Sequence, residues 1–170
     1  PIPENISSYL RRLEEFRLID RQYPILDEAS PRKSRYRIAD PYLRFWLTFV
    51  DTIRMTDLAA YHHWDKLVEL CEEGLPSFLG KTLERWFISS YLESGQWSPV
   101  GSWWDNKGLH EIDLIAVDET NKQIVFGEAK LNPEKYDKKK LEQSSQAFLS
   151  QHKKYADYSK KLVGLFPENM

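Results

Sequence analysis

The pattern of apolar and polar residues begins with a helix that is apolar along one side. Within residues 4–22, Ile6, Leu10 and Leu13 recur at intervals of three and four, and Asn5 stands in the N-cap position ahead of them. Three short segments follow: a β-rich stretch at 21–26, a polar loop at 27–33 and a second β-rich stretch at 34–40. The pattern therefore predicts a helix followed by a two-stranded ribbon.

A second zone is helical and acidic. Asp40 caps its first helix and Pro41 occupies the first helical position, where a missing N–H costs nothing. A second helical stretch follows at 59–75. Residues 51–82 carry three basic against six acidic side chains, a balance of −3. Such a charge suits a solvated connector, so residues 40–77 are predicted to be a helical connector.

A third zone alternates between helical and β-rich patterns. Its predicted elements are a helix at 77–94, a strand near 98–104, strands at 110–118 and 123–130 joined by a polar turn, a helix at 133–158 and a strand at 160–166. This order predicts an α/β domain (α+β overall) over residues 78–170, with a mixed central sheet flanked by helices.

Composition adds limits to this outline. The 170 residues are 41% hydrophobic and carry a net charge of −2, enough for one good core or two small ones and unlike a protein that coats nucleic acid. The single cysteine, Cys71, excludes an intrachain disulfide. No apolar run approaches the ~18 residues of a membrane span. We therefore expect a cytoplasmic protein without membrane contact, and the start at Pro1 suggests a fragment of a longer chain.

The predicted hairpin at 110–130 carries unusual charges for two strands rich in apolar residues. Side chains alternate between the faces of a strand, so Glu111 shares a face with Asp113, and Glu128 shares one with Lys130. If the strands are antiparallel neighbours, Asp113 and Glu128 lie close enough to bind one Mg²⁺ (or Mn²⁺), which keeps most of its water shell. Lys130 then reaches the same place and can orient an attacking water.

The same charges have a simpler interpretation. An edge hairpin can expose its charges to solvent and pair them as glutamate and lysine. The apolar runs LIAV and IVFG around the charges favour strands inside a covered sheet, where uncompensated carboxylates are costly. This favours a functional site over a solvated edge.

Asp113 followed by Glu128-Ala129-Lys130 resembles the D…E-x-K spacing of the PD-(D/E)XK nuclease superfamily, over roughly residues 78–167. A glutamate on a preceding helix completes the pattern in the Holliday-junction resolvase branch, and Glu84 stands in that place. The resemblance implies a restriction-endonuclease-like fold and metal-dependent hydrolysis of DNA. Asp113 and Glu128 would bind the metal, and Glu84 would assist in binding it, directly or through water. Lys130 would position the nucleophile, and Glu111 would join or orient the metal ligands.

The helix at 133–158 contains a second, shorter pattern. Gln151 and Tyr155 form a Q-x-x-x-Y arrangement similar to one in RecB-like nucleases, where it touches DNA. An ordinary helix face is the alternative. His152 lies among lysines and is predicted to face solvent, and Trp103 and Trp104 are predicted to belong to the core rather than to stack on bases.

The segments RYRIADPYLRFWLTFV, GKTLERW and WWDNKGLHEIDLIAVD are together similar to the C-terminal half of a family of archaeal-type ATPases. This resemblance implies a P-loop ATPase domain, a winged helix and a nuclease-like domain of unknown function in the full-length protein. No G-x-x-x-x-G-K-[ST] motif occurs in this chain, so the ATPase domain would be a partner outside it.

A helix followed by a ribbon with a basic loop is typical of the end of a winged helix, so residues 1–39 are predicted to be the C-terminal part of one. Its predicted DNA-binding residues are Ser7, Ser8, Arg11, Arg12, Arg32 and Lys33. Packing against the ATPase domain is the alternative role. For the whole chain, two functions stay open: a metal-dependent DNA nuclease, and a non-catalytic DNA-binding or docking module.

Overall fold

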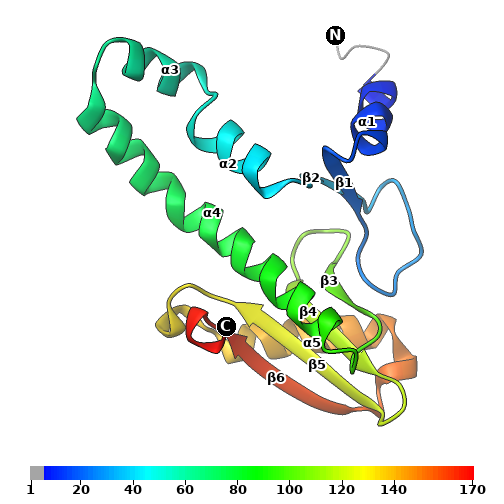
Figure 1. The fold of residues 1–170 in the computed structure, drawn as a ribbon. Coiled ribbons are helices and arrows are strands. Elements are labelled where there is room, and N and C mark those ends of the chain that lie inside the picture. Colours follow the sequence, from blue (N-terminus) through cyan, green and yellow to red (C-terminus); the bar gives the residue numbers. More distant parts are fainter. Residues whose placement is uncertain (1–5) are drawn as a thin grey trace. The chain divides into compact units, whose positions relative to one another are not determined.

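The structure is a computed structural model that describes residues 6–170, so the predicted N-cap Asn5 lies outside the described residues (Figure 1). The chain divides into two compact units. The N-terminal unit comprises Pro1–Gln22 and Ser34–Phe78, and the sheet unit comprises Tyr23–Lys33 and Leu79–Met170. The described part contains five α-helices and a mixed four-stranded sheet, which confirms the predicted α/β class.

The N-terminal unit begins with helix α1 (Ile6–Glu15) and two antiparallel strands, β1 (Ile19–Gln22) and β2 (Arg35–Ile38). The helix is shorter than predicted and the first strand lies earlier in the chain. Arg17 adopts a left-handed conformation with φ of 56°, which ends the helical path. Ile19, which lies within the segment 4–22 predicted to be helical, instead pairs with Ile38 across the two strands.

Three helices follow: α2 (Pro41–Phe49), α3 (Ile53–Ala60) and α4 (Trp64–Glu93). The predicted cap is present, because the Asp40 carboxylate accepts a hydrogen bond from the Leu43 N–H at 2.6 Å. The helical stretches predicted at 59–75 and 77–94 are joined into one helix, α4, which begins only at Trp64 and continues through Pro76, whereas residues 59–60 end α3. A proline removes one hydrogen bond from a helix, yet the many remaining bonds of a 30-residue helix maintain its path.

The sheet unit is built around strands β3 (Val100–Trp104), β4 (Glu111–Asp118), β5 (Gln123–Ala129) and β6 (Ser159–Leu165), in that spatial order. The first three strands are antiparallel, whereas β6 lies parallel to β5. Helix α5 (Lys138–Gln151) provides the crossover between these two strands. The helix predicted at 133–158 is interrupted, because Asp137 caps α5 and short 3₁₀ turns occupy Pro133–Lys135 and Lys153–Tyr155.

Both faces of the sheet are covered (Figure 1). On the face of α5 the buried cluster consists of Trp103, Ile112, Ile115, Val117, Ile124, Phe126, Leu141, Phe148 and Tyr155. On the face of α4 it consists of Leu83, Phe87, Leu114, Ala129 and Leu165. The hairpin β4–β5 is therefore an interior part of a covered sheet, and its charged residues lie where the two strands reach the edge of this core.

The loop between β1 and β2 belongs to the sheet unit. Asp27 is its anchor: its side chain is 5% exposed and lies 2.5 Å from Lys33 Nζ and 2.9 Å from His152 Nε2. The Trp103 indole N–H also donates to Asp27, at 3.4 Å. The prediction that His152 faces solvent is thus wrong, because its side chain is 14% exposed and its Nε2 lies beside this buried carboxylate.

Candidate metal centre

The register of β4 and β5 places two carboxylates side by side. Leu114 pairs with Gly127 in the antiparallel ladder, so the next position along both strands brings Asp113 opposite Glu128 on the same face. Residues directly opposite each other in such a pair have Cβ atoms about 5 Å apart. The turn after Asp118 sets this register, because Asn121 donates to the Asp118 carboxylate from its backbone and its side chain.

Gly127 allows close packing beneath these carboxylates. A Cβ atom at this position would lie 2.7 Å from Leu165 Cδ1 and 3.2 Å from Leu114 Cβ. The absence of a side chain lets β6 and β4 pack closely around the end of β5. The same packing holds Glu128, the next residue, in place at the edge of the core.

Asp113 is held by the backbone of the neighbouring strand. Its Oδ2 accepts a hydrogen bond from the Ala129 N–H at 2.9 Å. Burial, followed by the negative charge of Glu84, raises the pKa of Asp113 to about 6, although this hydrogen bond, Lys130 and Lys81 act in the opposite direction. In the metal-free protein, the surroundings of Asp113 therefore compensate the negative charge of its carboxylate only in part.

Glu128 and Lys130 project from the same face of β5 and form an ion pair. Lys130 Nζ lies 2.7 Å from Glu128 Oε1, and the Glu128 side chain is 12% exposed. The other oxygen, Glu128 Oε2, is buried and has no hydrogen-bond partner within residues 6–170. A buried carboxylate oxygen without a donor is expensive, and a cation or a donated proton at this position would remove that cost.

Helix α4 adds a third carboxylate. Leu83 and Phe87 anchor the helix on the sheet, and Glu84, adjacent to Leu83, is turned toward the strands. Lys81, one helical turn earlier, donates to both oxygens of Glu84 at 2.9 Å. Burial lowers the pKa of Lys81, but the hydrogen bond and the charges of Glu84, Asp113 and Glu111 outweigh that effect and raise it.

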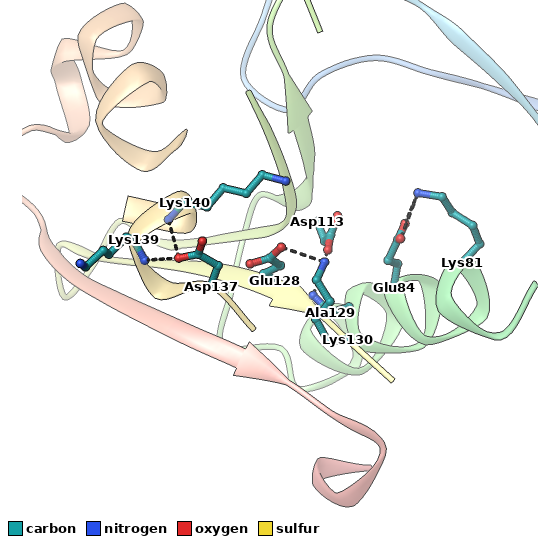
Figure 2. Close-up of polar contacts among 9 residues, drawn as sticks. All are labelled: Lys81, Glu84, Asp113, Glu128, Ala129, Lys130, Asp137, Lys139 and Lys140. Atoms are coloured by element: carbon teal, nitrogen blue, oxygen red, sulfur yellow. Dashed lines mark hydrogen bonds and ion pairs between the residues drawn. The ribbon is translucent and has the colours of Figure 1, made fainter. Parts of the chain in front are cut away.

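These side chains line a single pocket of about 220 Å³. Figure 2 shows Lys81 and Glu84 on α4, Lys140 on α5, and the carboxylates of β4 and β5 between the two helices. The full lining consists of Lys81, Glu84, Glu111, Asp113, Glu128, Lys130, Lys140, Leu141 and Ser144. All nine residues belong to the sheet unit.

The donor set of this pocket fits a hard divalent cation with few protein ligands. Within residues 6–170, no group of three or more histidine, cysteine, aspartate or glutamate side chains is arranged to hold a metal ion. Mg²⁺ is commonly bound through one or two carboxylates and retains several waters, so Asp113 and Glu128 suffice for it. The unpartnered Glu128 Oε2 is the observation that favours such an ion here.

Comparisons with known proteins place the chain in a family. A family model described as "Archaea bacterial proteins of unknown function" (DUF234) matches residues 46–143, more than half of the chain. The chain belongs to this family. An uncharacterized protein, MJECL04, of Methanocaldococcus jannaschii is 27% identical over 133 residues, which cover 74% of this chain and 29% of that protein. The chain thus spans less than a third of this relative's length, and no solved structure matches it significantly.

Membership in DUF234 agrees with the predicted archaeal and bacterial resemblance, whereas an attached ATPase domain stays a prediction. The family's description assigns no activity. Any function for this DUF234 chain therefore has to be argued from the pocket itself. None of the helices in the described residues is long and apolar enough to span a bilayer.

The structure places the predicted catalytic and metal-binding residues of this DUF234 chain together. Glu84, Asp113, Glu128 and Lys130 line the pocket, and the exposed Glu111 lies at its margin. Two pocket lysines, Lys81 and Lys140, were not singled out from the sequence. A lysine one turn before the helix glutamate was the available indication for Lys81, but i,i+3 pairs of this kind are common on helix surfaces.

The predicted DNA-binding residues lie in both units. Arg11 and Arg12 are exposed on α1 of the N-terminal unit, together with Ser7 and Ser8. Arg32 is exposed in the sheet unit, whereas Lys33 is partly buried and paired with Asp27. Their contacts with DNA stay predictions.

The Q-x-x-x-Y residues differ in accessibility. Gln151 is exposed at the end of α5, whereas Tyr155 is 4% exposed and its hydroxyl lies 3.5 Å from Glu119 Oε1. Neither lines the pocket that holds the carboxylates. Their contact with DNA stays a prediction. The prediction that Trp103 and Trp104 belong to the core is confirmed, because both are buried.

Proposed function

We propose that the sheet unit is a metal-dependent nuclease that hydrolyses phosphodiester bonds of DNA. One observation carries the proposal: Glu84, Asp113, Glu128 and Lys130 converge on a single pocket from one helix and two adjacent strands. Their types and order agree with the D…E-x-K resemblance of the sequence. A hairpin whose charges only face solvent would not contain a buried glutamate oxygen without a partner beside an aspartate with a raised pKa.

In this proposal each residue has a separate task. Asp113 and Glu128 would hold a Mg²⁺ or Mn²⁺ ion, which supplies Lewis-acid stabilisation of the negative charge that develops on the phosphate. Lys130, already oriented by Glu128, directs its ammonium at the water that attacks phosphorus. Glu84 contributes a further acceptor for the hydrogen atoms of that water.

The reaction is a hydrolysis and needs no co-reactant other than water. The water oxygen forms a bond to phosphorus, one ester P–O bond breaks, and the proton released by the water ends on the leaving alkoxide. The products are a phosphate monoester end and a hydroxyl end. The residues of the pocket therefore have to position a water and neutralise charge, and they undergo no covalent change.

The test is cleavage of branched, flapped and single-stranded DNA with Mg²⁺, with Mn²⁺ and with a chelator. Asp113→Asn should abolish cleavage and weaken Mn²⁺ binding. Lys130→Ala should abolish cleavage while metal binding is retained, because Lys130 is not a ligand. Lys135→Ala, which removes an exposed lysine from the 3₁₀ turn that follows, is the matched control and should cleave normally.

Two results would count against the nuclease. If Mn²⁺ binds but none of these DNA structures is cleaved, the non-catalytic module becomes the better explanation. If Mn²⁺ at millimolar concentration does not bind the wild-type protein, the metal is removed from the proposal altogether.

We also propose that α1 contributes to DNA binding in the full-length protein, where an ATPase domain would adjoin it. The support is that no residue of α1 is buried and that Arg11 and Arg12 are both exposed. Replacing Arg11, Arg12 and Arg32 with alanine should weaken DNA binding and reduce the slope of affinity against salt by about one per lost phosphate contact. An unchanged slope would leave α1 only a packing role.

A further inference from the structure

Lys81 occupies an unusual place among the charges of the pocket. It lies on α4 one turn before Glu84, and its ammonium is 2.9 Å from each of the two Glu84 oxygens. It also interacts electrostatically with Asp113 and Glu111, so its charge acts on three of the four pocket carboxylates and not on one helix neighbour alone. A two-oxygen contact of this kind places a positive charge against both Glu84 oxygens, where a metal ion bound by Glu84 would otherwise lie.

The three inner carboxylates, Glu84, Asp113 and Glu128, differ in how many of their oxygens already have a donor beside them. Glu84 has both oxygens bound to Lys81. Asp113 uses Oδ2 to accept from the Ala129 N–H, and Glu128 uses Oε1 to bind Lys130. Among the described residues, Asp113 and Glu128 thus each keep one oxygen with neither an ammonium nor an N–H beside it, whereas the Lys81 ammonium already lies against both oxygens of Glu84.

The charges of the pocket lead to the same conclusion. Its lining has four carboxylates (Glu84, Glu111, Asp113 and Glu128) and three lysines (Lys81, Lys130 and Lys140), so −4 and +3 sum to −1 when all are ionised. One divalent ion changes the sum to +1, which attracts a phosphodiester. A second divalent ion would bring it to +3 and would have to displace Lys81 from Glu84.

We propose that Lys81 replaces a second metal ion: the pocket binds one divalent cation between Asp113 and Glu128, and the Lys81 ammonium neutralises Glu84 where another cation would otherwise bind. This inference rests on the proposed metal-dependent function and assigns that function a one-metal site. Lys81 is a positioning residue in this arrangement, because it acts on the metal site through Glu84.

The test is the number of Mn²⁺ ions bound per chain, measured by calorimetric titration and by electron paramagnetic resonance of the unbound ion. The wild-type protein should bind one Mn²⁺. Lys81→Met keeps the length of the side chain but removes its charge, and it should bind two. Lys81→Arg restores the charge and should return the number to one. Lys138→Met removes an exposed lysine of α5 that does not line the pocket, and it serves as the matched control, which should still bind one.

Several results would overturn the inference. They are two Mn²⁺ ions in the wild-type protein, none at all, or an unchanged single ion in Lys81→Met, which would reduce Lys81–Glu84 to a surface ion pair. Hydrogen exchange of the β4 and β5 amides would verify that each variant is folded. The outcome is separable from the nuclease proposal. If Lys81→Met changes the number of ions from one to two but no DNA is cleaved, the role of Lys81 is supported and the nuclease is not. If the wild-type protein cleaves DNA with two ions bound, the nuclease is supported and the role of Lys81 is not.

Discussion

Replacing Asp113 with asparagine should stabilise the metal-free protein, and the gain should grow as the pH rises from about 4 to about 7. The pKa of Asp113 in the fold is about 6, compared with an ordinary value of 3.8. The folded state therefore binds the proton more strongly than the unfolded state does. As the pH rises from 3.8 through about 6, the protein loses stability, because the carboxylate must ionise where burial and Glu84 oppose its charge.

The size of this effect follows from the pKa difference. A pKa difference of about 2, at about 1.4 kcal/mol for each pH unit, corresponds to a destabilisation of about 3 kcal/mol. This destabilisation is fully present above about pH 7 and is less than about 1 kcal/mol near pH 4. Asparagine has nearly the same shape, and its side-chain oxygen can still accept from the Ala129 N–H. Its amide group can donate to the carboxylates nearby. Asp113→Asn should therefore raise the free energy of unfolding by most of this amount at about pH 8 and by almost nothing near pH 4.

The assay is urea denaturation of the protein in the presence of a chelator, followed by hydrogen exchange of the β4 and β5 amides, which reports on the sheet unit by itself. Glu111→Gln is the matched control, because it removes the same charge from an exposed position on the same strand. Its effect should depend much less on pH. The reasoning is refuted if Asp113→Asn destabilises the protein at high pH, or if its gain is the same at both pH values.

Three further predictions concern the site and its support. Mn²⁺ affinity, measured by calorimetry, should fall by up to about tenfold per pH unit below about pH 6, because protonation of Asp113 competes with the metal; a constant affinity would exclude Asp113 as a ligand. Asp27→Asn should lower the free energy of unfolding by about 1–3 kcal/mol, since it removes the charge that its lysine and histidine partners face, and an unchanged urea midpoint would contradict this role. Gly127→Ala should destabilise the protein by about 1–3 kcal/mol, because the added methyl group would press against Leu165. Gly80→Ala on α4, with open space around it, should be neutral or stabilise the protein by up to about 1 kcal/mol. Equal effects of the two substitutions would contradict the close packing under the site.

Much of the candidate site was predictable because a strand has a short and strict period. Because side chains alternate along a strand, Asp113 shares a face of its strand with Glu111. For the same reason, Glu128 shares a face with Lys130. The short polar turn between the two strands predicts antiparallel pairing, which the register confirms. These are local properties, set by backbone geometry and by residues close together in the chain.

Element boundaries were less predictable where local tendencies conflict. Ile19 continues the helical spacing of α1, but it also suits a strand, and pairing with Ile38 decides in favour of the strand. Pro76 is a typical helix breaker, yet α4 continues through it, and side chains that follow the proline are packed against other parts of the fold. Phe78 contacts Phe49 at 5.3 Å, and Leu83 is buried against the sheet.

Only the tertiary structure decided which distant residues share a partner. The sequence determined, by its alternating pattern, that a covered hairpin carries two carboxylates and a lysine on one face. It contained no indication that the loop of Asp27 belongs to the sheet unit and lies beside His152, and the spacing of Lys81 and Glu84 did not show that their ion pair lines the pocket. The physical reason is that charges act through space and are tuned by burial, so their partners and pKa values depend on how helices and strands pack, which local periodicity does not encode.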